Sequence, residues 1–272
     1  ASFQFVVDAL PGDRHVLAFD WRGFGLSDPT PGDTYWLPDY VGDLDAALDA
    51  LAFGFGTPRQ PIDLLGHSMG GNVVMIYAGL RPERIRRLVN LEGFGMPVTQ
   101  PSQSPQRYLR WLDELKTPVT LRDYASLDAV AERLRKNNPL LSPARAAWLA
   151  QHWSRRRGGA DDDGRYEILG DPLHKHGTPL LYQRDEVLAC WAQIRAPLLW
   201  VEGDRTDLAT WWGTRYSKAE FHARLDVVAN ARREVLAPAG HMLHHDQPEA
   251  LAGHLARHLA AAPPAPGRTA PT

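Results

Sequence analysis

Short apolar runs alternate with longer segments of helical periodicity along most of this chain. Five runs are rich in leucine, valine and isoleucine, which is typical of strands. They are residues 15–20, 61–66, 85–93, 196–203 and 233–239. The runs 15–20, 61–66 and 196–203 are nearly continuous in apolar residues, as expected for parallel strands that are covered on both faces.

Amphipathic or buried helices are predicted between these strands, and a further one at the start of the chain. The predicted helices span residues 1–10, 37–53, 70–80, 217–228 and 248–262. Alternation of strand and helix indicates an α/β fold with a doubly wound, mostly parallel sheet.

The alternation stops between about residue 97 and residue 195. This segment shows four helical patterns and no convincing strand, so we predict an all-helical lid inserted between two core strands. The helical patterns cover residues 106–116, 127–137, 142–157 and 184–194. The predicted organisation is a core in two parts (1–96 and 196–262), a helical lid (97–195) and a disordered tail (263–272) that is rich in proline and alanine.

The amino-acid composition limits which binding partners and which cellular compartment are expected. The chain has 272 residues, 44% of them hydrophobic, and a formal net charge of −2. It therefore carries no excess of basic charge for nucleic acid or an anionic membrane, and no apolar run is long enough to span a bilayer. Cys190 is the only cysteine, which excludes an internal disulfide and favours a cytoplasmic location. We expect Cys190 to pack as a small apolar side chain rather than to react.

The sequence Gly66-His67-Ser68-Met69-Gly70 has the pattern G-x-S-x-G, with a predicted strand before it and a helix after it. A serine on such a sharp turn lies in a strained backbone region, and its hydroxyl is lifted clear of the sheet. We expect side chains at positions 66 and 70 to collide with neighbouring backbone. The amide of Met69 would point at an oxyanion that forms on a bound carbonyl.

A serine needs a base and the base needs a carboxylate. His241 follows the last predicted strand, where ligands approach an open α/β sheet. For the acid we favour Asp207, with Asp204 as the alternative and Glu92 as a third candidate. The neighbours His244, His245 and Asp246 are interpreted as hydrogen-bonding residues at a helix start. His241 and His245 have the spacing of a helical metal pair, but no third ligand is apparent, so we expect no metal.

Five segments resemble the α/β-hydrolase superfamily, in its lid-bearing serine hydrolase branch. They are "FDWRGFGLSD" (19–28), "GHSMGG" (66–71), "YAGLRPERI" (77–85), "LLWVEGDRTD" (198–207) and "AGHMLHHDQPE" (239–249). The resemblance implies Ser68 as nucleophile, His241 as base, Asp207 as acid, the Met69 amide as oxyanion donor, and no cofactor. Members of this superfamily carry two or three further strands and a His-Gly-x loop before the position where this sequence begins. A missing front portion is therefore predicted. Asp20 and Arg22 are expected to shape a turn beside the site.

The function expected from these residues is hydrolysis of a small-molecule carboxylic ester, or a related acyl bond, through an acyl-enzyme. Alternatives on the same site are C–C bond hydrolysis, lactone opening and cofactor-free haloperoxidase chemistry. A binding protein with vestigial catalysis is a further alternative. Aromatic residues of the lid could line an acyl pocket or pack its helices together. They are Tyr108, Trp111, Trp148, Trp153, Tyr182 and Trp191.

Overall fold

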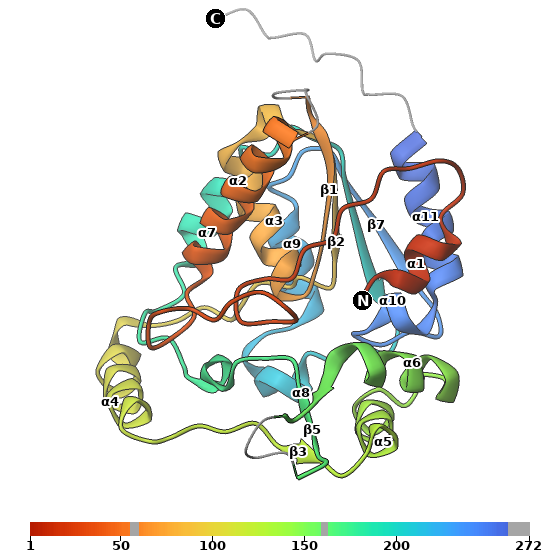
Figure 1. The fold of residues 1–272 in the computed structure, drawn as a ribbon. Helices are drawn as coiled ribbons and strands as arrows, with labels where there is room; N and C mark the ends of the chain where they lie inside the picture. The colour runs from red at the N-terminus through yellow and green to blue at the C-terminus, as the bar shows by residue number, and fades with distance from the viewer. Residues whose placement is uncertain (55–59, 159–162, 261–272) are drawn as a thin grey trace, which may run out of the picture.

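The computed structural model describes residues 1–54, 60–158 and 163–260. The predicted tail (263–272) lies outside the described residues. A central sheet carries helices on both faces, and a separate layer lies across one end of it (Figure 1). The helices are α1 (Gln4–Ala9), α2 (Leu37–Gly54), α3 (Met69–Leu80), α4 (Ser104–Leu115), α5 (Leu127–Asn137), α6 (Pro143–Trp153), α7 (Arg184–Trp191), α8 (Ala209–Trp212), α9 (Lys218–Leu225), α10 (Leu243–Asp246) and α11 (Pro248–Ala260). The strands are β1 (Ile62–His67), β2 (Ile85–Leu91), β3 (Asp123–Tyr124), β4 (Ser154–Arg156), β5 (Tyr166–Ile168), β6 (Leu198–Gly203) and β7 (Ala231–Leu236).

The predicted parallel, doubly wound sheet is confirmed. Its order is β1-β2-β6-β7, and each neighbouring pair is parallel. All four carboxyl ends therefore open at one edge, which is the edge that faces the layer containing α4, α5 and α6 (Figure 1). In an open α/β sheet this is where residues for binding and chemistry gather.

Alternate strand residues bury two separate cores. On one face Leu64, Leu88 and Trp200 pack with α2, α3, α7 and α9. On the other face Val89 and Val201 pack with α1, α10 and α11. Burial on both faces explains why the strand segments are nearly continuous in apolar residues. It also fixes the register, because a slip by one residue would exchange the two faces.

The prediction of a strand at residues 15–20 is wrong. This segment has no regular secondary structure and is exposed, including Val16 (42%) and Leu17 (50%). An apolar run becomes a strand only when a neighbouring strand takes up its backbone hydrogen bonds. Among the described residues, no strand of either sheet pairs with this segment.

The segment between β2 and β6 is not all-helical, which corrects the prediction for the lid. It contains α4, α5 and α6, but also a small antiparallel sheet of order β3-β5-β4. Strands of two or three residues are too short to show an alternating pattern, and Ser154–Arg156 looked like the end of a helix. The helix α7 also differs from the prediction, because Trp191 lies in the main core beside α3 rather than in a lid.

The turn that follows residue 20 is held by its polar side chains, as predicted. Asp20 accepts a hydrogen bond from the Leu26 amide at 3.1 Å. Arg22 forms a bidentate pair with Asp43 of α2, with nitrogen-to-oxygen distances of 2.6 and 2.5 Å. These contacts fasten the turn to the core. Within the described ranges, no helix is long and apolar enough to cross a membrane.

Candidate active site

Ser68 stands on the turn between β1 and α3 in a strained conformation. Its φ is 53° and its ψ is −118°, backbone angles that residues other than glycine rarely adopt. Its backbone N–H donates to the Leu91 carbonyl at 2.8 Å, which ties the turn to β2. The strain is therefore held in place by the sheet beneath it.

Close approach of neighbouring atoms, backbone at one position and a buried side chain at the other, explains two of the surrounding glycines. A Cβ at Gly66 would lie 2.2 Å from the Gly70 carbonyl oxygen, and one at Gly71 would lie 2.3 Å from Oδ1 of Asn90. Gly70 differs from the prediction, because a Cβ there would meet its nearest neighbour, Nε1 of Trp21, at an ordinary 3.5 Å. The turn thus requires glycine at 66 and 71, whereas position 70 has room for a small side chain.

The structure brings His241 to Ser68, as predicted. His241 lies in the loop between β7 and α10, and its Nε2 is 2.9 Å from Oγ of Ser68. Both side chains are partly exposed, so a substrate can reach them. The ring of Trp211, on α8, lies edge-on to the imidazole with centroids 4.6 Å apart. Trp211 is 43% exposed and was not among the aromatic residues expected at the site.

The carboxylate that contacts His241 is Glu92, not Asp207. Oε2 of Glu92 is 3.0 Å from Nδ1 of His241, and its side chain has no exposed surface. Its other oxygen, Oε1, accepts from the Gly203 amide at 2.6 Å. Because an ionised carboxylate only accepts, Nδ1 of His241 carries the proton and Nε2 is left to accept from the serine hydroxyl.

Asp207 and Asp204 have other partners, which corrects the expected geometry. Asp207 is exposed, and its Oδ1 accepts from the Ala209 amide at 2.9 Å at the start of α8. Oδ1 of Asp204 accepts from the Ala239 amide at 2.8 Å, so Asp204 braces the loop that carries His241. The physical reason is the order of the strands: β2 lies next to β1, so a side chain that follows β2 is already close to the serine turn.

A tight turn places Glu92 there. Glu92 has a φ of 60°, and its amide donates to the Val201 carbonyl at 3.1 Å. Oδ1 of Asn90, which is fully buried, accepts from the Gly93 amide at 2.9 Å and closes the turn. A sequence signal existed: Glu92 is a charged residue that directly follows a buried strand and precedes glycine.

The helix α3 begins at Met69, as required for the predicted oxyanion donor. The first backbone N–H groups of a helix have no acceptor within the helix, and they lie at the positive end of its dipole. Met69 therefore presents an amide beside Ser68. This arrangement can stabilise an oxyanion that forms on an acyl carbon attacked by Ser68.

The histidines around His241 are shielded from water, His67 partly and His244 and His245 almost completely. His67 precedes Ser68, and its Nε2 lies 2.7 Å from the His241 carbonyl oxygen. His244 and His245 are almost completely buried, and His244 shares Oγ of Ser2 with His245 at 3.0 and 3.4 Å. Removal from water lowers the pKa of His67 to about 3 and that of His245 to about 4, and also lowers the pKa of His244.

These histidines predict a loss of stability in mild acid. Below about pH 6.5 the unfolded chain binds protons that the folded protein does not, so the free energy of unfolding falls as the pH drops toward 4. At pH 5.5 each of the three should lower the free energy of unfolding by on the order of 1 kcal/mol, so that together they lower it by several kcal/mol. Urea denaturation at pH 7.5 and 5.5 measures the difference. His245→Gln should reduce this pH-dependent difference in the free energy of unfolding by about one third. His152→Gln, at an exposed position, should leave the difference unchanged. Equal stability of the wild-type protein at both pH values would contradict the prediction.

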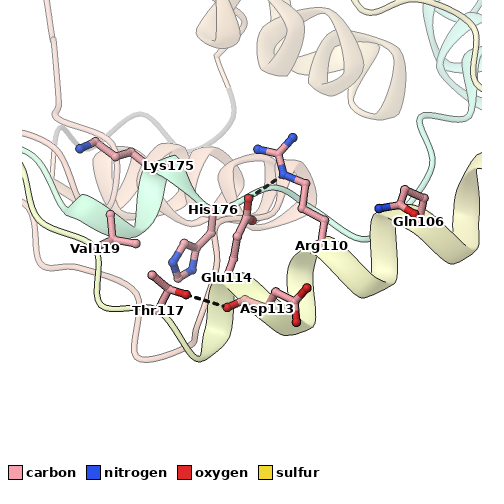
Figure 2. A pocket seen from close by; sticks show the side chains of 8 residues that line it. All are labelled: Gln106, Arg110, Asp113, Glu114, Thr117, Val119, Lys175 and His176. Carbon is pink, nitrogen blue, oxygen red and sulfur yellow. Dashed lines mark hydrogen bonds and ion pairs between the residues drawn. The ribbon is translucent and has the colours of Figure 1, made fainter.

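A surface pocket away from Ser68, His241 and Glu92 is lined in part by charged side chains. It has a volume of about 470 Å³ and lies between α4 and residues 175–176 (Figure 2). Its charged side chains already have partners, since Glu114 pairs with Arg110 and accepts from the Gly177 amide, and Lys175 donates to the Thr120 carbonyl. None of Ser68, His241 and Glu92 lines it. Within the described ranges no group of three potential metal ligands comes together.

A parallel α/β sheet with serine, histidine and carboxylate at its carboxyl edge defines the α/β-hydrolase class. The chain belongs to this class: residues 1–254 match the model of the "Alpha/beta hydrolase family". It is 26% identical to "Esterase YbfF" of Escherichia coli (strain K12) over 260 residues, which cover 92% of this chain and 84% of that protein. It is 30% identical to a "Serine hydrolase-like protein" of Danio rerio over 205 residues, 73% of this chain and 59% of that protein.

Solved structures show the same fold. The hypothetical protein PA1622 from Pseudomonas aeruginosa PAO1 aligns with a TM-score of 0.75 and 27% identity, over 95% of this chain and 85% of that one. The thioesterase domain from the curacin biosynthetic pathway aligns with a TM-score of 0.70 and 23% identity, over 87% and 79%. The chain spans about three fifths of the length of the Danio rerio relative.

Proposed function

We propose that this protein is a serine hydrolase that cleaves a carboxylic ester, or a related acyl bond, of a small molecule. The observation that carries the proposal is one continuous line of contacts. Oγ of Ser68 lies 2.9 Å from Nε2 of His241, and Nδ1 of the same ring lies 3.0 Å from Glu92. An activated nucleophile has this arrangement, in which the base contacts the hydroxyl and a third group orients the base.

In the proposed mechanism His241 accepts the proton of Ser68 while Oγ attacks the carbonyl carbon. The buried carboxylate of Glu92 stabilises the imidazolium that forms, and the Met69 amide donates to the oxyanion. His241 then gives its proton to the leaving alcohol, and an acyl-enzyme remains on Ser68. Water attacks this ester with His241 again as base, which releases the acid and restores the serine hydroxyl.

The relatives support an acyl-cleaving reaction and also favour one second candidate. One relative is called an esterase and another a serine hydrolase-like protein. Over 103 residues, 37% of this chain, the sequence is 35% identical to "2-hydroxymuconate semialdehyde hydrolase" of Pseudomonas sp. (strain CF600). Hydrolysis of a C–C bond beside a carbonyl is therefore the second candidate. A pure binding protein has no need for the complete line of contacts.

A fluorophosphonate probe tests the proposal without knowledge of the substrate. We expect one covalent adduct, on the peptide that contains Ser68, and no adduct in the folded Ser68→Ala variant. A panel of p-nitrophenyl esters, lactones and vinylogous diketones then separates ester hydrolysis from the second candidate. Folded protein that does not react, or that reacts at a residue other than Ser68, would refute the proposal.

A further inference from the structure

His67 connects the turn that carries the nucleophile to the loop that carries the base. It is the last residue of β1 and directly precedes Ser68. Its Nε2 lies 2.7 Å from the backbone carbonyl oxygen of His241. A carbonyl oxygen only accepts, so His67 must be the tautomer with the proton on Nε2 and must donate.

The loop around His241 is otherwise held from its far side. The Ala239 carbonyl accepts from the Arg205 amide at 2.9 Å, and the Gly240 amide donates to Oδ2 of Asp246 at 2.9 Å. These contacts come from the loop after β6 and from α10. The His67 bond comes instead from the last residue of β1, directly before Ser68, so it relates the backbone of residue 241 to the backbone of residue 68.

We infer that His67 is a positioning residue for catalysis: its hydrogen bond to the His241 carbonyl sets the distance between the imidazole and Ser68. This inference rests on the proposed function and goes beyond it, because it adds a residue that touches neither the substrate nor the reacting atoms. Attack by serine needs the base within hydrogen-bond reach, and a displacement of about 1 Å can cost about 10²-fold in rate.

The surroundings of His67 suit this role. Its ring packs against the rings of both His241 and His244, with centroid distances of 4.9 and 4.3 Å. Burial keeps the imidazole neutral, as its lowered pKa indicates. A neutral donor holds the loop without adding positive charge next to His241 when that ring takes up the serine proton.

Two substitutions separate the hydrogen bond from mere filling of space. His67→Leu removes the donor, and we expect the rate constant for fluorophosphonate labelling of Ser68 to fall about 10- to 100-fold. His67→Gln keeps a side-chain N–H, and it should restore labelling to within about fivefold of wild type. For an ester substrate, the loss in His67→Leu should appear in kcat, with KM within about twofold.

His174 offers a matched control. Its Nε2 also lies within hydrogen-bond distance of a backbone carbonyl oxygen, that of Gly23, at 3.1 Å. His174→Leu removes a bond of the same kind away from Ser68 and should label at nearly the wild-type rate. If His67→Leu labels as fast as wild type, or if His67→Gln is as slow as His67→Leu, the inference is overturned.

The outcomes for the two proposals remain distinct. Wild-type protein that is not labelled at Ser68 refutes the serine hydrolase itself. Wild type that is labelled, together with an unimpaired His67→Leu, refutes only the role of His67. Should the variants fail to fold, imidazole ¹⁵N NMR of the wild-type protein decides: a proton on Nε2 of His67 is expected, and a proton on Nδ1 overturns the inference.

Discussion

Glu92→Gln is expected to lower kcat/KM for ester hydrolysis by about 10⁴-fold, although the side chain hardly changes in size. Two donors converge on this carboxylate, Nδ1–H of His241 and the Gly203 amide. A glutamine has one oxygen that accepts and one nitrogen that donates, so it cannot serve both. If its amide group faces His241, the imidazole must adopt the other tautomer, with its proton on the nitrogen that should accept from Ser68.

Asp207→Asn is the matched control, since it makes the same change in the carboxylate that the sequence favoured. Asp207 is exposed and its carboxylate accepts, among the described residues, only from the Ala209 amide at the start of α8, so kcat/KM should stay within about threefold of wild type. Steady-state rates with p-nitrophenyl acetate, on variants with matched circular dichroism spectra, measure both effects. A large loss in Asp207→Asn with little change in Glu92→Gln would show that the acid is not Glu92.

The difference between Ser68 and Glu92 shows what sequence reasoning can reach. The turn at Ser68 is local: a strand, a glycine forced by a 2.2 Å approach, and a helix all lie within a few residues. His241 is nearly as local, because it lies in the short loop that follows β7, the last strand of the sheet. The choice of acid depends instead on which of two parallel strands, β2 or β6, brings its carboxyl end closer to β1. That distance cannot be predicted from the sequence.

The fold, too, has elements that the sequence predicts and elements that it does not. The strands β1, β2 and β6 were predictable because their apolar residues pack on both faces of the sheet. The edge strand β7 is mostly exposed, so its pattern is weaker. The helices around the sheet were predictable because their periodicity continues over several turns. Residues 15–20 have the same apolar pattern, yet they form no strand, because pairing depends on a neighbour as well as on composition. The strands β3, β4 and β5 are too short for any periodicity and are stabilised by pairing with one another.

The backbone strain at Ser68 predicts that two equally inactive variants differ in stability. Ser68→Ala and Ser68→Gly both remove the nucleophile, so kcat should fall about 10⁵-fold or more in each. They differ at the backbone, where φ is 53° and ψ is −118°. Alanine must keep this strained conformation, whereas glycine adopts positive φ without a Cβ clash.

We therefore expect Ser68→Gly to be more stable than Ser68→Ala by about 1 kcal/mol, because relief of about 1–3 kcal/mol of strain exceeds the extra entropy of glycine in the unfolded chain. Urea denaturation at pH 7.5 measures the difference, which corresponds to a Tm about 2–4 °C higher. At positions with negative φ the order is reversed, and a glycine variant is less stable than the alanine variant. If Ser68→Gly proves less stable than Ser68→Ala, the turn stores no strain, and the exposed position of the hydroxyl must be explained by the packing of α3 alone.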